Sequence, residues 1–183
     1  MKNPINPWKT ISSKELYADR FSRFRADAVI RPDNQKGTYS VLETRPAVAI
    51  SAVTPDGRIA LTGEWRYPQK TFMWGVPAGL SDEGESPLAC AKRELLEEAF
   101  ITSPKWVNLG LIAPASGRMS TVVHIFLAKN AKVQRFKPAV DEIQKRRLVP
   151  VSTAVHMCND GRIFCGVSML AIYKAACYLG ILK

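Results

Sequence analysis

The chain has 183 residues, a formal net charge of +10 at pH 7 and a hydrophobic content of 46%. This length fits one domain with a sizeable core, and the composition is ordinary for a globular protein. No apolar run approaches the roughly 20 residues that cross a bilayer, and the first ten residues lack the apolar segment of a secretory signal, so we expect a cytoplasmic protein without a membrane partner.

Cysteines and histidines are sparse, which argues against several kinds of site. The two histidines, His124 and His156, are too few to favour a histidine metal site or a Ser/His triad. No Cys-x-x-Cys pair is present, and we expect reduced, buried thiols at Cys90, Cys158, Cys165 and Cys177. The positive charge would attract nucleic acid or small phosphorylated metabolites, and charge alone does not separate these partners.

Strand signals come first along the chain. Residues 23–44 are typical of two strands around a Pro-Asp-Asn turn. Apolar runs that favour further strands follow at 46–53 and 59–67, joined by a Pro-Asp-Gly turn, and then at 72–80, 106–113, 121–128 and 146–152. Helical spacing appears at 87–99, 153–158 and 167–179. Together these elements predict an α+β fold, a mixed sheet with a few helices on its faces, preceded by a separate strand-rich segment of about 45 residues.

The helix expected over 87–99 has clear start signals. Ser86 is a good N-cap and Pro87 suits the first helical position. The apolar face predicted to be buried consists of Leu88, Ala91, Leu95 and Ala99.

Three glutamates of this helix share another face. Glu94, Glu97 and Glu98 stand at i, i+3 and i+4, where like charges repel by roughly 0.2–0.5 kcal/mol per pair. A solvated face would interleave lysines at these spacings, and this one leaves the carboxylates without such partners. A divalent cation would supply the missing charge, and Mg²⁺ prefers oxygen ligands of this kind.

The stretch from Gly79 to Ile101 resembles the Nudix box, G-x5-E-x7-R-E-U-x-E-E-x-G-U, in which U is a bulky aliphatic residue. Eight of the nine defined positions match, namely Gly79, Glu85, Arg93, Glu94, Leu95, Glu97, Glu98 and Ile101. The resemblance implies that Glu94, Glu97 and Glu98 bind Mg²⁺ or Mn²⁺ and that Glu85 and Arg93 hold the loop on the helix. Phe100 departs from the pattern, because the family has a glycine there. We expect altered packing at this position and retained activity.

The resemblance extends beyond the box to the ADP-ribose and nucleoside-diphosphate-sugar pyrophosphatases. The segments EWRYP, WGVPAGL and VVHIFLAKN and the tail GRIFCGVSMLAIYKAACYLG are similar to that subfamily. This likeness implies the Nudix fold, an α/β/α sandwich with a mixed sheet, over residues 46–183. It also implies that residues 1–45 form a strand-rich region that pairs two subunits into a homodimer.

The resemblance assigns roles to single residues. Ala78 would offer its backbone carbonyl to a metal, and Arg66 would contact substrate phosphate, although a surface arginine explains Arg66 equally well. Gly79 and Glu85 complete the expected substrate-binding set. The catalytic base is sought among the carboxylates Glu97, Asp141 and Glu142. Stacking of a base is conceivable for Trp65, Trp74 and Trp106, which are more simply expected in the core.

The predicted activity is metal-dependent hydrolysis of the pyrophosphate bond of nucleoside diphosphate sugars of the ADP-ribose, ADP-glucose or GDP-mannose type. The products would be a nucleoside monophosphate and a sugar phosphate. One alternative is a Nudix pyrophosphohydrolase that acts on RNA caps or dinucleotides, which only the basic surface favours. An alternative of another class is a non-catalytic sensor of ADP-ribose-like ligands. A small-molecule substrate is the expected partner, and nucleic acid is not.

Overall fold

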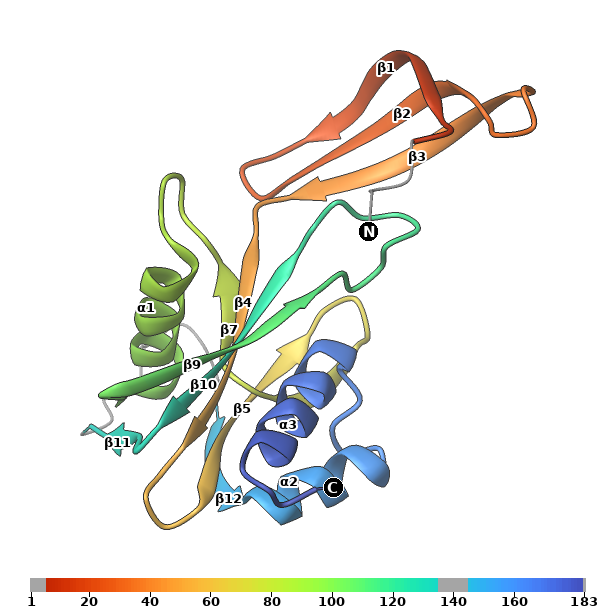
Figure 1. The fold of residues 1–183 in the computed structure, drawn as a ribbon. Helices are drawn as coiled ribbons and strands as arrows, with labels where there is room; N and C mark the ends of the chain where they lie inside the picture. The colour runs from red at the N-terminus through yellow and green to blue at the C-terminus, as the bar shows by residue number, and fades with distance from the viewer. Residues whose placement is uncertain (1–5, 135–144, 183) are drawn as a thin grey trace. The chain divides into compact units, whose positions relative to one another are not determined.

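The computed structural model describes residues 6–134 and 145–182. The chain divides into two compact units, each with its own internal contacts (Figure 1). The first consists of Met1–Arg45 with Ala113–Thr121, and the second of Pro46–Ile112 with Val122–Lys183. Among the described residues, no helix is long and apolar enough to span a membrane.

The first unit is built on an antiparallel three-stranded sheet in the order β1-β2-β3. Its strands are β1 (Lys9–Ala18), β2 (Ser22–Ile30) and β3 (Lys36–Thr44). The two strands expected within 23–44 are confirmed as β2 and β3, whereas β1 was not foreseen. All ten residues of β1 are exposed, and its sequence, KTISSKELYA, has no apolar alternation that would predict a strand.

A second segment of the chain, Ala113–Thr121, belongs to this unit. The amide of Leu42 donates to the carbonyl of Arg118 at 2.8 Å, and the amide of Ser120 donates to the carbonyl of Leu42 at 3.1 Å. The hydroxyl of Tyr39 donates to the carbonyl of Gly117 at 2.8 Å. The segment is thereby held along β3.

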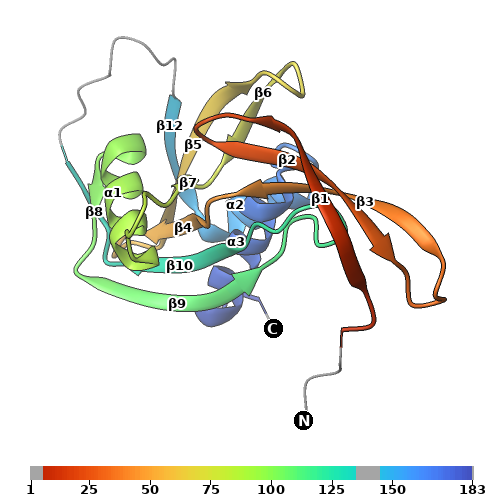
Figure 2. The ribbon, with the colours of Figure 1, turned by 90° about the horizontal axis from the view of Figure 1, so that it is seen from above.

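The second unit contains a mixed seven-stranded sheet with the order β12-β5-β4-β10-β9, in which β6 pairs with β5 and β7 with β4. The pairing of β4 with β10 is parallel, and the other pairings in the sheet are antiparallel. Figure 2 shows β9 and β12 at opposite edges. The strands are β4 (Ala47–Val53), β5 (Arg58–Arg66), β6 (Thr71–Gly75), β7 (Ala78–Leu80), β9 (Lys105–Ile112), β10 (Val123–Lys129) and β12 (Lys145–Pro150), and a separate pair is formed by β8 (Ile101–Thr102) and β11 (Lys132–Val133).

Helices cover both faces of this sheet, with α1 (Pro87–Ala99) on one face and α2 (Val151–Asn159) and α3 (Gly166–Tyr178) on the other (Figure 1). Successive strand residues pack alternately into the two cores, as a period of two requires. Ala49 joins the core under α2 and α3, and Ile50 joins the core under α1. The predicted α/β/α arrangement with a mixed sheet is confirmed.

The bounds of α1 agree with the expectation from the sequence. The Ser86 hydroxyl accepts a hydrogen bond from the Ala89 amide at 3.3 Å, and Pro87 opens the helix. The predicted apolar face was wrong at one position, because Leu88 is exposed and Cys90 is buried instead. The other two helices are confirmed, and each begins a residue or two before the predicted start.

All four cysteines lie among the described residues and are free, as expected. The expectation that all four are buried holds for only two of them. Cys90 and Cys158 are buried, whereas Cys165 is half-buried and Cys177 is exposed. Both of the latter lie in or beside α3, whose outer face is apolar at several exposed positions. The expectation of four buried thiols was therefore wrong for two of them.

Candidate active site

The loop before α1 is held against the helix by Arg93. Its guanidinium donates to both carboxylate oxygens of Glu85, at 3.1 and 2.9 Å, and to the carbonyl of Leu80 at 3.1 Å. The amide of Asp82 also donates to Glu85, at 2.9 Å. Arg93 and this amide lower the pKa of Glu85 to about 2, because their hydrogen bonds favour the charged carboxylate.

Arg93 also reaches the glutamate face of α1. The same guanidinium contacts Glu94 at 2.7 Å and Glu97 at 3.1 Å. The expectation of three carboxylates without a cationic partner was therefore wrong for two of them. The pairing with Glu97 follows from i, i+4 spacing, whereas Glu94 is the next residue in the sequence.

Glu98 lies in a different environment from its neighbours. Burial raises its pKa to about 8, although the amide of Ala78 donates to its carboxylate at 3.0 Å and works in the opposite direction. Burial likewise raises the pKa of Glu94, whose side chain is 12% exposed. Glu97, in contrast, is 58% exposed. The helix thus presents two half-buried acids and one exposed acid.

Gly79 gives the Glu94 carboxylate the space that it occupies. A Cβ atom at position 79 would lie 2.1 Å from the carboxyl carbon of Glu94. The glycine of the box is thus required because a carboxylate fills the volume of the missing side chain. Ala78 is fixed next to it by strand pairing with Ala49.

The donor set fits a hard divalent cation. Within the described ranges, 6–134 and 145–182, no three acidic, histidine or cysteine side chains already stand in a metal-binding group, and Arg93 contacts both Glu94 and Glu97. Half-buried carboxylates with raised pKa values are nevertheless groups that a cation would stabilise in their charged form. Glu94 and Glu98 supply such oxygens, and Glu97 would join them after leaving Arg93.

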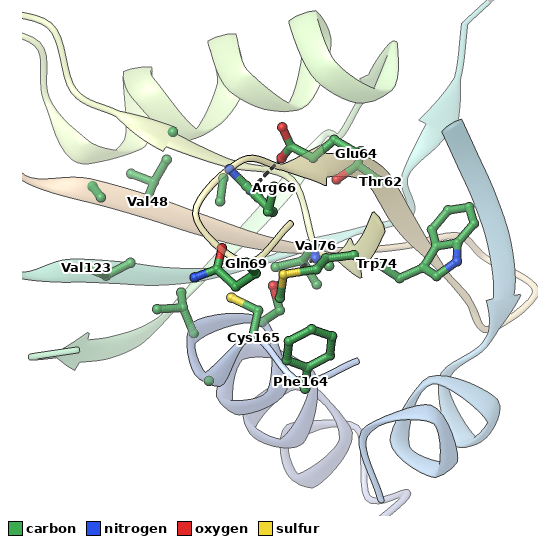
Figure 3. Close-up of a pocket in the computed structure, with 18 of the residues that line it drawn as sticks. Val48, Thr62, Glu64, Arg66, Gln69, Trp74, Val76, Val123, Phe164 and Cys165 are labelled. Carbon is green, nitrogen blue, oxygen red and sulfur yellow. Dashed lines mark hydrogen bonds and ion pairs between the residues drawn. The ribbon is translucent and has the colours of Figure 1, made fainter. Parts of the chain in front are cut away.

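A cavity of about 640 Å³ opens beside these acids (Figure 3). Ala78 and Gly79, which contact Glu98 and Glu94, form part of its wall. Arg66 also lines the cavity, as the expected contact with substrate phosphate would require. Glu85 does not line the cavity and is bound to Arg93, and its place in the substrate-binding set stays a prediction.

Sequence reasoning missed several residues of the cavity wall, which are Glu64, Gln69, Phe164, Cys165 and Ser168. Only Glu64 had a usable signal, since it stands two positions before Arg66 and therefore on the same face of β5. The residues from α3 are brought in by the packing of that helix, which local sequence does not specify.

Other candidates lie elsewhere. Asp141 and Glu142 fall outside the described residues. Trp65 is 64% exposed, so the core expectation was wrong for it. Trp74 lines the cavity, but Figure 3 shows its indole turned away from Glu64 and Arg66, and the guanidinium of Arg147 lies 4.9 Å from its ring centre. Trp106 packs against the core under α1 and does not line the cavity, so the three tryptophans do not gather at one base-binding position.

The sequence matches the NUDIX domain family over residues 43–163. The chain belongs to this family. Residues 8–42 match the nucleoside diphosphate sugar hydrolase N-terminal domain. Hydrolases of the Nudix family generally depend on a divalent metal, which agrees with the donor set of α1.

Relatives of known name cover much of this chain. It is 29% identical to ADP-ribose pyrophosphatase of Bacillus subtilis (strain 168), over 73% of this chain and 72% of that protein. It is 25% identical to the methanol dehydrogenase activator of Bacillus methanolicus, over 90% of each. A crystal structure of an ADP compounds hydrolase has a TM-score of 0.83, at 18% identity, over 97% of this chain and 96% of that one, and shows the same fold.

Proposed function

We propose that this Nudix hydrolase cleaves the pyrophosphate bond of nucleoside diphosphate sugars of the ADP-ribose, ADP-glucose or GDP-mannose type, with Mg²⁺ or Mn²⁺. The observation that carries the proposal is the cavity that joins Arg66 to the carboxylate face of α1 through Ala78 and Gly79. The match of residues 8–42 to a nucleoside diphosphate sugar hydrolase N-terminal domain supports this substrate class.

Separate residues of the site would bind the metal and the substrate phosphate. Glu94, Glu97 and Glu98 would hold the metal, together with the carbonyl of Ala78. When bound, the metal would neutralise the pyrophosphate and lower the pKa of an attacking water. Arg66 would meet the phosphate from the strand side.

Water attack would form one P–O bond while the bridging P–O bond breaks, which gives a nucleoside monophosphate and a sugar phosphate. A carboxylate would take the proton of the water, and the candidates are Glu97, Asp141 and Glu142. Glu97 is the most exposed of the three acids of α1 and is free to turn once it leaves Arg93. We propose that one of these groups is the general base.

We also propose that the protein is a homodimer assembled through residues 1–45. The apolar side chains Ile11, Leu16 and Tyr17 of β1 are at least half exposed, and a second copy would cover them. Light scattering should give the mass of two chains. A monomeric mass at the working concentration of the enzyme would refute the dimer and leave the assignment of the reaction intact.

A substrate panel tests the activity. Purified protein with Mg²⁺ is given ADP-ribose, ADP-glucose, GDP-mannose, ATP and capped RNA, and a phosphatase releases phosphate from the products. We expect cleavage of at least one diphosphate sugar with kcat/KM tenfold to a thousandfold above that of ATP, a difference of roughly 1.4–4 kcal/mol. Preference for RNA caps would support the alternative substrate. Binding of ADP-ribose without turnover of any compound would support a sensor.

A further inference from the structure

The wall of the cavity on β5 carries two opposite charges. Thr62, Glu64 and Arg66 alternate along the strand and all line the cavity. The guanidinium of Arg66 lies 2.5 Å from a carboxylate oxygen of Glu64, the pair drawn with a dashed line in Figure 3. Among the described residues of the lining, these are the charged side chains. This wall therefore has no net charge.

The pairing changes what Arg66 offers to a ligand. An isolated arginine would attract each phosphate group that approaches it, whereas a paired one must share its donors with a carboxylate. Glu64 is 33% exposed at its side chain and Arg66 is 51% exposed, so the pair faces the open part of the cavity and not the core. An incoming phosphate meets the negative charge of Glu64 together with the positive charge of Arg66.

We propose that Glu64 is a specificity-determining residue: by pairing with Arg66, it keeps the cavity wall neutral, so that the site accepts diphosphate diesters and rejects ligands with a terminal phosphate. A diphosphate sugar carries about two negative charges, close to the carboxylate face of α1 and its expected cation. A triphosphate carries about two more, and a neutral wall does not compensate them. The inference rests on the proposed function, which places the substrate phosphate at Arg66.

The variant Glu64→Gln tests this role, because it should increase the affinity of the protein for ATP. Glutamine keeps the size and the hydrogen-bond acceptor but removes the charge, so Arg66 becomes available to phosphate. In the presence of a chelator and at low salt, isothermal titration should show ATP binding roughly three- to tenfold tighter than in the wild type, with a clearly smaller gain for ADP-ribose, which carries about half the charge. With Mg²⁺, the KM for ATP should fall while kcat changes little.

The chain offers a matched control in the turn that precedes β5. Asp56 pairs with Arg58 at 2.7 Å, also two positions apart, at the other end of β5. Asp56→Asn changes the net charge by the same amount far from the cavity lining and should leave ATP affinity unchanged. The double variant Glu64→Gln with Arg66→Gln should lose the gain, because the exposed cation is then gone.

The results of these experiments distinguish the role of Glu64 from the proposed reaction. Equal ATP affinity in Glu64→Gln and wild type, or an equal gain in Asp56→Asn, overturns the role of Glu64. An increased Mg²⁺ requirement without a gain in ATP affinity also overturns it and makes Glu64 a metal ligand. A gain in ATP affinity in a protein that hydrolyses no diphosphate sugar supports the role of Glu64 and refutes the proposed reaction.

Discussion

The two halves of the 79–101 motif use glutamates in opposite ways. In the loop half, Glu85 is bound by Arg93 and by a backbone amide, and its pKa falls to about 2. In the helix half, Glu98 is half-buried with one backbone donor, and burial raises its pKa to about 8. The protein thus supplies several hydrogen-bond donors to the carboxylate of Glu85 and only one backbone donor to that of Glu98. Our proposal assigns the first carboxylate to the shape of the site and the second to metal binding.

Among the variants of this motif, Glu98→Gln should have the largest effect on activity. The amide keeps the shape and the acceptor for Ala78, but it cannot bind a cation as a carboxylate does. We expect turnover to fall by roughly a hundredfold or more, while the melting temperature measured in a chelator stays close to that of the wild type. Addition of Mg²⁺ should raise the melting temperature of the wild type and not of the variant. Full wild-type turnover in excess chelator would contradict the metal requirement.

Gly79→Ala should give the next largest effect. The new methyl group would displace the carboxylate of Glu94, which is the end of a flexible side chain and moves at little cost to the fold. We expect the Mg²⁺ concentration for half-maximal activity to rise about tenfold or more, with a melting temperature near that of the wild type. Glu94→Gln gives the comparison, because the double variant should be little worse than Glu94→Gln alone if both act through one carboxylate.

The sequence predicted the helix half of the motif better than its surroundings. Ser86, Pro87 and the apolar spacing are local signals, so the bounds of α1 were predicted correctly. The bridging of Glu94 and Glu97 by Arg93 was missed, although its i, i+4 component is visible in the sequence. The cavity wall depends on the packing of α3 against the sheet, a long-range event that no local pattern specifies.

The variant Glu85→Gln tests the loop half of the motif through the pH dependence of the melting temperature. A lowered pKa means that the charged Glu85 stabilises the folded state above its ordinary pKa of 4.5, and that this contribution disappears as the pH falls toward 2. The melting temperature of the variant should therefore lie below that of the wild type at pH 7, and the two should converge between pH 4.5 and 2. Circular dichroism follows both transitions.

The exposed Glu83 on the same loop supplies the control for this experiment. Glu83→Gln removes the same charge from the same segment, and we expect a melting temperature within about one degree of the wild type at pH 7. Should Glu83→Gln and Glu85→Gln lose equal stability, the general charge of the loop would be responsible and not the contact with Arg93.

The smallest expected effect concerns Phe100, which closes the helix half in the left-handed conformation with φ 52° and ψ 45°. A side chain in that conformation costs about 1–2 kcal/mol, which glycine avoids. Phe100→Gly and Phe100→Ala both remove the ring, so their difference isolates the backbone. We expect the glycine variant to be more stable by about 1 kcal/mol, or roughly 2–4 °C in melting temperature.

Leu179 provides the matched comparison for this backbone effect, because it ends α3 with φ −84° and ψ −2° and is also partly buried. There the right-handed conformation suits alanine, and Leu179→Gly should be the less stable of the two truncations. Opposite signs at the two helix ends would show that Phe100 strains the backbone where the family pattern has glycine. Equal signs would show that the left-handed conformation at position 100 has no measurable backbone cost.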